Sequence, residues 1–314
     1  MASQAQREQT RRPAATVPPP EAVDPVWLLK AFGVMLLLAL LCTYITLCGL
    51  FYRGQWQLVL HPSRSSVPPP TVGGLPFDVV RFGAEATGLP QLTGWWIPAP
   101  AAASSSPLTI LFLPGGDGSL ADDQGTLAAL HDLGAAVFAI DYRGYGQSAA
   151  LHPSEQTMTE DAESAWGYLT GSRALHADTI LLYGHGLGAS LALHLAATQG
   201  AAPAVILDSP DFKVEQRVRM DPRTRLVPLG LLFHDRFALL PALSEVRTPK
   251  LILTRGVEED AAVLKAANPK VTAALPPRTS AAQDIEIIRR FLDQYALPLA
   301  PPTAAPALGP TPAP

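Results

Sequence analysis

A short apolar run followed by three alternate glycines constrains this chain more than any other feature. Residues 180–183 are Ile, Leu, Leu and Tyr, a run that predicts a buried strand, and Gly184, Gly186 and Gly188 follow it. From residue 187 onward, apolar side chains recur at helical spacing. The stretch therefore predicts a strand, a sharp turn and a helix. Such a corner gathers backbone N–H groups beside the positive end of the helix and favours negative charge there.

One chemistry that uses this corner is acyl transfer by a serine in the pattern Gly-x-Ser-x-Gly, where the N–H groups hold the oxyanion. Gly184 and Gly188 occupy the outer glycine positions, but Gly186 stands at the serine position. Glycine has no side chain and cannot act as a nucleophile. It also avoids most of the strain, about 1–3 kcal/mol, that such an elbow imposes on other residues. The pattern thus predicts the frame of a site without its attacking oxygen.

A second chemistry is nucleotide binding on a Gly-x-Gly-x-x-Gly/Ala turn. Gly184, Gly186 and Ala189 satisfy that pattern, so this turn is an alternative nucleotide-binding module. Asp208 ends the next expected strand, at the separation expected of a ribose-binding acid. The fingerprint normally follows the first strand of its fold, whereas several strands precede it here.

Composition excludes several other classes of protein. The chain has 314 residues, of which 48% are hydrophobic, and a net charge of −4, which suits one large core and gives no electrostatic case for nucleic acid. Both cysteines, Cys42 and Cys48, lie in one apolar N-terminal segment, so we expect no disulfides in the rest of the chain. The seven histidines are scattered without ligand spacing, and we expect neither a metal nor another cofactor.

The N-terminal segment predicts a single membrane anchor. Residues 1–25 are polar and predict a disordered tail, and the anchor follows within residues 26–56. Ala31 to Tyr52 carry no charge, are long enough to cross a bilayer core, and are bracketed by Trp and basic residues. The alternatives are a buried core helix and a cleaved signal peptide, which the long polar leader opposes. More basic residues precede the span than follow it, which favours a cytoplasmic N-terminus and a domain outside.

Strands and helices alternate along the rest of the chain. The expected strands are 77–82, 91–97, 108–113, 136–140, 179–183, 204–207, 250–254 and 271–275, and the expected helices are 121–133, 160–169, one after the elbow and one carrying Ile285, Ile288, Phe291 and Leu292. Such alternation predicts an α/β domain with a mostly parallel sheet and helices on both faces. It breaks at about residues 211–246, which we expect to form a small cap beyond the carboxyl ends of the strands. Residues 297–314 are rich in Pro and Ala and predict a disordered tail.

With its elements in this order, the chain resembles the α/β-hydrolase superfamily over about residues 57–296. Besides the elbow, the resemblance rests on residues 94–98 (Gly-Trp-Trp-Ile-Pro), 141–148 (Asp-Tyr-Arg-Gly-Tyr-Gly-Gln-Ser) and 206–210 (Ile-Leu-Asp-Ser-Pro). The chain looks most like the branch with a single N-terminal membrane span, whose eukaryotic members include protein depalmitoylases. The resemblance implies the α/β-hydrolase fold and a serine-hydrolase site.

Catalysis in that family requires a serine, an acid and a histidine in this chain order. The resemblance places the acid at Glu259, with Asp260 as the near alternative. It places the histidine after the strand 271–275, where the sequence is Pro-Pro-Arg-Thr-Ser, and no histidine follows His234. The catalytic triad is therefore expected to be degenerate, because its serine and its histidine are both missing.

Three residues are candidates to replace the missing groups, although each is out of place. Ser190 lies one helical turn past the elbow and is expected to face its own helix. His185 occupies the variable position of the elbow, and His234 lies in the cap and precedes the acid in the chain.

The loop expected to form the oxyanion hole also departs from the family, because Pro-Gly-Gly-Asp-Gly follows the strand 108–113. The backbone N–H groups of Gly116 and Leu187 remain candidate donors. Asp117, however, is expected to place a negative charge near the oxyanion, which opposes catalysis.

The missing serine, the missing histidine and the charge expected at Asp117 all argue against catalysis. The sequence predicts a membrane-anchored pseudohydrolase that binds an acyl or lipid-like ligand, or a protein partner, without turnover. One alternative is an active esterase or thioesterase with a displaced catalytic set. The other is the nucleotide-binding module at Gly184–Ala189.

Overall fold

The computed structural model describes residues 24–65, 67–84, 88–101, 108–255, 270–275 and 281–295. The chain divides into two compact units, residues 1–50 and residues 51–314. Nearly all of the expected N-terminal tail and all of the expected C-terminal tail lie outside the described residues.

The first unit contains most of helix α1, Pro25–Gly54. No residue of α1 is buried, and its mean hydropathy reaches 2.4 over an 18-residue window. In the described part of the chain it is the one helix long and apolar enough to cross a membrane, a test that a signal sequence near the N-terminus also meets.

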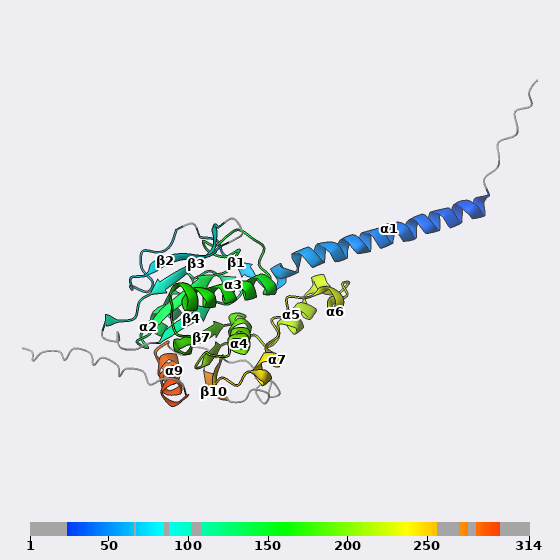
Figure 1. The fold of residues 1–314 in the computed structure, drawn as a ribbon. Coiled ribbons are helices and arrows are strands. Elements are labelled where there is room, and N and C mark those ends of the chain that lie inside the picture. The colour runs from blue at the N-terminus through cyan, green and yellow to red at the C-terminus, as the bar shows by residue number, and fades with distance from the viewer. Residues whose placement is uncertain are drawn as a thin grey trace, which may run out of the picture. The chain divides into compact units, whose positions relative to one another are not determined.

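The second unit, which we call the body, contains an eight-stranded sheet in the order β10-β9-β8-β7-β4-β6-β3-β2 (Figure 1). The strands are β2 Asp78–Ala84, β3 Pro90–Ile97, β4 Thr109–Leu113, β6 Ala136–Asp141, β7 Ile180–His185, β8 Val205–Asp208, β9 Lys250–Arg255 and β10 Lys270–Leu275. β3 is antiparallel to both of its neighbours, and the other pairs are parallel. A two-residue strand β1, His61–Pro62, pairs separately with β5, Asp117–Gly118. The expected mostly parallel sheet is confirmed.

The helices of the body are α2 Gln124–His131, α3 Glu155–Gly167, α4 Gly188–Gln199, α5 Val214–Met220, α6 Leu229–Leu232, α7 Leu239–Glu245 and α9 Ala281–Tyr295. Short 3-10 helices lie at Gln55–Leu58, Ala177–Thr179 and Pro222–Thr224, and a π-helical segment lies at Tyr168–Ser172. Helix α3 begins five residues before its predicted start, because Ser154 and Thr157 form a reciprocal capping box there.

The two faces of the sheet bury two separate layers of side chains. Leu111, Phe138 and Leu182 point into the layer shared with α3, α4, α5 and α7, whereas their neighbours Phe112 and Leu181 point into the layer shared with α2 and α9. Because successive residues of a strand face opposite sides, strands covered on both faces are apolar throughout. This explains the continuous apolar runs from which the strands were predicted.

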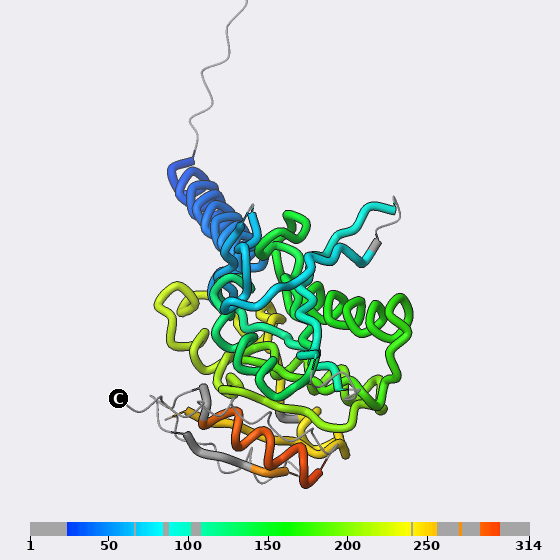
Figure 2. Tube along the Cα trace, turned by 90° about the vertical axis from the view of Figure 1, so that its left-hand side faces the viewer, coloured from blue at the N-terminus to red at the C-terminus, as the bar shows by residue number. Residues whose placement is uncertain are grey.

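Helices α5, α6 and α7 interrupt the alternation between β8 and β9. They occupy the region predicted as a cap, and Figure 2 shows this excursion in yellow-green and yellow along one side of the body. Its helices are short, and its buried apolar side chains are Val214, Val218, Val227, Phe233, Phe237, Leu239, Leu243 and Val246.

Candidate functional site

The elbow lies at the centre of the sheet, where β7 ends and α4 begins. β7 is bonded to β4 on one side and to β8 on the other, so its carboxyl end is fixed by both neighbours. Gly186 adopts a φ of +55°, a conformation that costs other residues energy. Its N–H donates to the carbonyl of Asp208 at 2.9 Å, which ties the turn to the end of β8.

The outer glycines of the elbow are required by close backbone contacts. A Cβ on Gly188 would overlap the carbonyl oxygens of Leu113 and Pro114, and a Cβ on Gly184 would lie 2.6 Å from the Cα of Ala189. Both contacts are with backbone, which cannot move without breaking the sheet. These two glycines therefore allow α4 to pack directly on β7 and on the end of β4.

The central glycine is different. A Cβ on Gly186 would have only the Cα of Gly115 within 4 Å, at 3.6 Å, which is an ordinary contact. The space at Gly186 therefore admits a side chain, and only its positive φ favours glycine. Packing does not explain why a side chain is absent at this position.

Gly116 lies against the side chain of Leu187, the other residue predicted to supply an oxyanion donor. A Cβ on Gly116 would lie 2.6 Å from Cδ1 of Leu187 and 3.0 Å from Cδ2 of Leu60, so these side chains pack against the loop after β4. Within the described residues, neither the Gly116 N–H nor the Leu187 N–H donates to a backbone carbonyl. The side chain of Asp117 is 82% exposed, and its Oδ1 lies 2.6 Å from Nδ1 of His61.

The segment 141–148 holds the oxyanion loop in place. The hydroxyl of Tyr142 donates to the carbonyl of Pro114 at 3.1 Å, and the hydroxyl of Tyr145 donates to the carbonyl of Gly116 at 2.9 Å. Ser148 links this segment to β3 and β6, because its Oγ donates to the carbonyl of Asp141 and accepts from Thr93 N–H. The motif that carries the sequence resemblance thus has a structural role.

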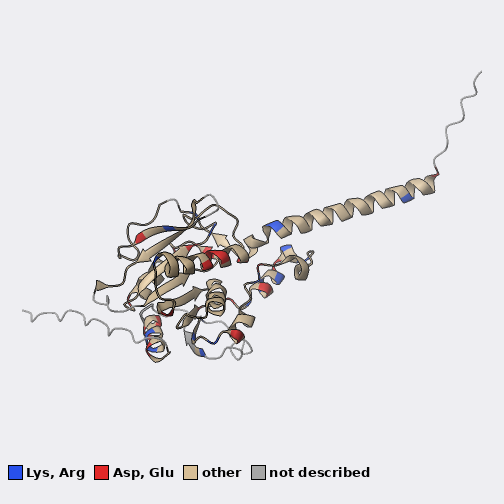
Figure 3. Ribbon diagram, in the orientation of Figure 1, with Lys and Arg blue, Asp and Glu red and all other residues tan. Residues whose placement is uncertain are grey.

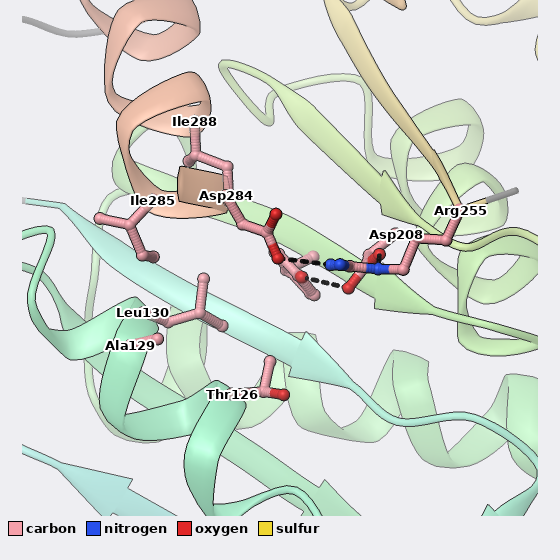
Figure 4. A pocket seen from close by; sticks show the side chains of 9 residues that line it. Thr126, Ala129, Leu130, Asp208, Arg255, Asp284, Ile285 and Ile288 are labelled. Atoms are coloured by element: carbon pink, nitrogen blue, oxygen red, sulfur yellow. Dashed lines mark hydrogen bonds and ion pairs between the residues drawn. The ribbon is translucent and has the colours of Figure 1, made fainter. Parts of the chain in front are cut away.

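A cluster of polar side chains lies beside the elbow at the ends of β7, β8 and β9. We call Tyr183, His185, Asp208, Arg255 and Asp284 the Asp208 cluster. Asp208, with 4% of its side chain exposed, accepts from the Tyr183 hydroxyl at 2.8 Å and pairs with His185 Nδ1 at 3.3 Å on one oxygen, and with Arg255 Nε at 3.3 Å on the other. Arg255 also pairs with Asp284 at 2.5 Å. Figure 4 shows Arg255 between the two carboxylates.

The bond between Asp208 and His185 shifts the pKa values of these two side chains in opposite directions. Burial alone would raise the pKa of Asp208, but hydrogen bonds from His185 and Tyr183 and the charge of Arg255 hold it well below its usual range. Burial alone would lower the pKa of His185, but the bond to Asp208 and the charges of Asp208 and Asp123 outweigh burial, so the pKa is raised. Burial also raises the pKa of Asp123 to about 6. The carboxylates around His185 therefore stabilise the protonated form of its ring.

A pocket of about 40 Å³ adjoins this cluster and is bounded by α2, with Leu130, and by α9, with Ile285 and Ile288 (Figure 4). The second oxygen of Asp284, Oδ1, is buried and has no hydrogen-bond partner in the described part of the chain. This volume suits one or two water molecules rather than an organic ligand.

The other candidate residues have separate locations. Ser190 is buried, and its Oγ donates to the carbonyl of Leu187 at 2.8 Å, so it faces its own helix as expected. His234 lies in the cap, with its Nδ1 2.8 Å from the side-chain nitrogen of Gln55 and its ring tilted by 46° against that of Tyr52. Glu259 and Asp260, the two positions predicted for the acid, lie outside the described residues.

Sequence reasoning missed most of the Asp208 cluster. The sequence indicates Asp208 only as a candidate ribose-binding acid and as part of the motif 206–210, and no pattern indicates Arg255 or Asp284. The available signal was the position of Tyr183, Asp208 and Arg255 at the carboxyl ends of adjacent strands, where parallel strands bring side chains together. No group of three or more His, Cys, Asp and Glu side chains in the described ranges could hold a metal ion.

Comparison with known proteins agrees with this geometry. Residues 106–295 match the family model of serine aminopeptidase, S33. An uncharacterized protein of Mycobacterium tuberculosis, Rv2307c, is 28% identical over 284 residues, covering 85% of this chain and 97% of that protein. The alpha/beta hydrolase domain-containing protein 17C of Xenopus tropicalis is 32% identical over 124 residues, covering 40% of this chain and 37% of that protein.

Solved structures share the fold at low sequence identity. The Pyrococcus furiosus esterase Pf2001 superimposes with a TM-score of 0.58 and 16% identity, covering 76% of this chain and 97% of the esterase. An alpha-beta hydrolase from Vibrio vulnificus has a TM-score of 0.53 and 18% identity, covering 74% and 95% of the two chains. The structural relatives share the α/β-hydrolase fold. Because the family model covers more than half of the chain, from β4 to α9, the chain belongs to the serine aminopeptidase S33 family of α/β-hydrolase-fold proteins.

Proposed function

We propose that this protein is a membrane-anchored pseudohydrolase that binds an acyl or lipid-like ligand, or a protein partner, without turning it over. The observation that carries the proposal is that the sequence lacks both the serine and the histidine of the catalytic triad. Gly186 stands at the nucleophile position, and no histidine follows His234 in the sequence. In this proposal Glu259 or Asp260 is a remnant of the acid, and Gly116 and Leu187 retain the oxyanion donors.

His185 does not replace the missing histidine in this proposal. Its Nδ1 faces Asp208 at 3.3 Å, and Gly186 beside it offers no hydroxyl to activate.

The anchor in the proposal is Ala31 to Tyr52, within residues 26–56, and the body spans 57–296 on the extracytoplasmic side. The length and apolarity of α1 support a single membrane span. The excess of basic residues before the span supports the orientation.

A fluorophosphonate probe tests inactivity directly, because it labels serines that a neighbouring base activates. We expect no covalent labelling of the full-length protein in detergent, with an active serine hydrolase as positive control. We also expect that Gly186→Ser will not restore turnover of a p-nitrophenyl acyl ester, because no histidine can take its proton. Labelling of the wild-type protein, or turnover by this variant, would contradict the proposal.

One observation favours the alternative of a displaced catalytic set. Ser190 and His194 both line a pocket of about 230 Å³, and His194 Nε2 lies 2.8 Å from a carboxylate oxygen of Glu163. Against it, the Ser190 hydroxyl already donates to Leu187 O. If wild-type protein is labelled and Ser190→Ala is not, the alternative is correct. The nucleotide-binding alternative is weaker, because the carboxylate of Asp208 that it requires is engaged by Tyr183 and Arg255.

A further inference from the structure

The excursion between β8 and β9 exposes large apolar side chains to an unusual degree. Met220, Leu226 and Leu231 have 70%, 74% and 83% of their surfaces exposed. They lie within twelve residues of one another in the sequence, on α5, on α6 and between them. Single exposed apolar residues are common, but three in one short segment are typical of an interaction surface. We call these three residues and the arginines among them the cap face.

The same segment is basic in a chain that is acidic overall. Residues 213–236 contain six Lys and Arg residues against three Asp and Glu residues, whereas the whole chain carries −4. Figure 3 shows basic positions along α5 and the turns that follow it. Arg219 and Arg223 pair with carboxylates of the same segment, and 59% and 68% of their side chains remain exposed. Such exposed pairs are worth little, so these arginines can exchange partners at small cost.

Contacts within the body place the middle of the excursion next to Tyr52 and Gln55, shortly after the body begins at residue 51. Gln55 is 2% exposed, its Nε2 donates to the carbonyl of Leu232 at 3.2 Å, and its Oε1 accepts from His234 N–H at 3.0 Å. The rings of Tyr52 and His234 lie 5.1 Å apart. Leu232, the residue after Leu231, is therefore hydrogen-bonded directly to Gln55, which follows the apolar stretch of α1.

A second loop also contacts the segment formed by Tyr52, Gln55 and Trp56, which we call the entry segment. The ring of His152 lies 5.3 Å from that of Trp56, and the preceding residue, Leu151, is 50% exposed. Two exposed leucines, Leu151 and Leu231, are thus each followed directly by a residue that contacts the entry segment.

From these contacts we infer that the cap face docks onto a bilayer surface rich in anionic lipids, the same bilayer that α1 enters. This inference rests on the proposed membrane anchor and adds a second, peripheral contact. The leucines insert among the acyl chains near the headgroups, and the arginines bind the lipid phosphates. Apolar side chains combined with basic residues are the features that bind proteins to the plane of an anionic interface.

An environment-sensitive fluorophore tests this contact in the full-length protein. Leu231→Cys, in a background of Cys42→Ser and Cys48→Ser, is labelled with the dye NBD and reconstituted into vesicles. In phosphatidylcholine vesicles that contain phosphatidylglycerol, we expect a blue shift and about a twofold gain in emission over pure phosphatidylcholine. Gln283→Cys, an exposed site on α9 against the opposite face of the sheet, is the matched control and should show neither.

The basic residues are tested by a second substitution. Each arginine near an anionic surface contributes about 1 kcal/mol, so Arg225→Gln should lower the docked-to-undocked ratio about fivefold in the anionic vesicles. Arg290→Gln on α9 should leave that ratio unchanged.

The outcomes separate this inference from the anchor itself. Protein that alkaline carbonate extracts from the vesicles overturns the anchor and, with it, the docking. Protein that resists extraction while the dye at 231 stays hydrated leaves the anchor intact and overturns the docking. An equal shift in pure phosphatidylcholine, or an equal shift at residue 283, also overturns the docking. A concentration-dependent shift in detergent would indicate contact with a second copy of the chain and overturns the docking as well.

Discussion

Two adjoining regions of the body, the elbow and the Asp208 cluster, are built in opposite ways. The elbow is made of backbone, because Gly184 and Gly188 let β7, α4 and the end of β4 meet without side chains between them. The Asp208 cluster is made of ionisable side chains, with Asp208 bonded to Tyr183, His185 and Arg255. The elbow has the backbone geometry of a hydrolase site but no side chain at Gly186. The Asp208 cluster has ionisable side chains, and these are bonded to one another.

The difference shows that a hydrolase frame and hydrolase chemistry depend on different residues. The frame requires glycines where backbones approach closely, and the segment 141–148 that holds the oxyanion loop. The chemistry requires a nucleophile beside a base, and Gly186 offers no side chain at the elbow. The residues that build the frame are therefore separate from those that would carry out catalysis.

The largest effect is expected when the Asp208 cluster is broken. Asp208→Ala leaves Arg255 and Tyr183 without their shared acceptor, and breaking a buried ion pair costs about 3–5 kcal/mol. We expect the lower part of that range, because 25% of the Arg255 side chain and 39% of the His185 side chain are exposed. Guanidinium unfolding in detergent measures the loss. Asp178→Ala on the exposed surface should change stability by less than about 0.5 kcal/mol, and a similar effect at both sites would mean that the cluster adds nothing.

The second prediction compares the outer and central glycines. Gly188→Ala forces a Cβ onto the carbonyls of Leu113 and Pro114 and should cost about 2–3 kcal/mol, as overpacking does. Gly186→Ala meets only an ordinary contact and should cost about 1 kcal/mol, from its positive φ. Thermal unfolding of the two variants measures both losses. Equal losses would mean that the elbow tolerates no side chain at either position, and packing would then explain Gly186.

The sequence predicted the frame well because apolar runs and glycines report local and backbone constraints. Every strand of the sheet was located within two residues of its observed ends, and the Gly184–Gly188 turn was identified as a strand-to-helix elbow. The start of α3 was missed, because the Ser154 and Thr157 capping box lies outside the apolar pattern used to locate the helix.

The sequence predicted the Asp208 cluster poorly because it depends on tertiary proximity. Arg255 and Asp284 are separated by a stretch outside the described residues, and no local pattern links either one to Asp208. Asp117 shows the same limit. It follows the expected oxyanion residue directly in sequence, yet β5 pairs with β1 and turns its side chain towards His61 and solvent.

A smaller effect is expected in the pH dependence of stability. The pKa of His185 is raised in the folded protein, so its contribution is complete below the unfolded value, about 6.5, and is lost as the pH rises through the folded value. His185→Gln should therefore lower stability more at pH 6 than at pH 9, by less than about 1 kcal/mol because the ring is partly exposed. Unfolding midpoints across this range measure the difference, with His176→Gln as control. A difference that grows with pH would contradict a raised pKa for His185 in the folded protein.

The smallest effect is expected at Asp117, which follows the predicted oxyanion residue in the sequence but pairs with His61 at the surface. If its charge acted on the elbow, Asp117→Asn would strengthen binding of an anion there, such as an acyl carboxylate. Because 82% of the side chain is exposed and it pairs with His61, we expect stability to change by less than about 0.5 kcal/mol. We also expect fatty-acid binding, measured by calorimetry, to be unchanged. Gly116→Ala, which drives a Cβ into Leu187 beside the elbow, is the contrasting variant and should weaken any such binding. Tighter binding by Asp117→Asn would show that this carboxylate reaches the elbow in solution and would restore it as a third departure from the catalytic pattern.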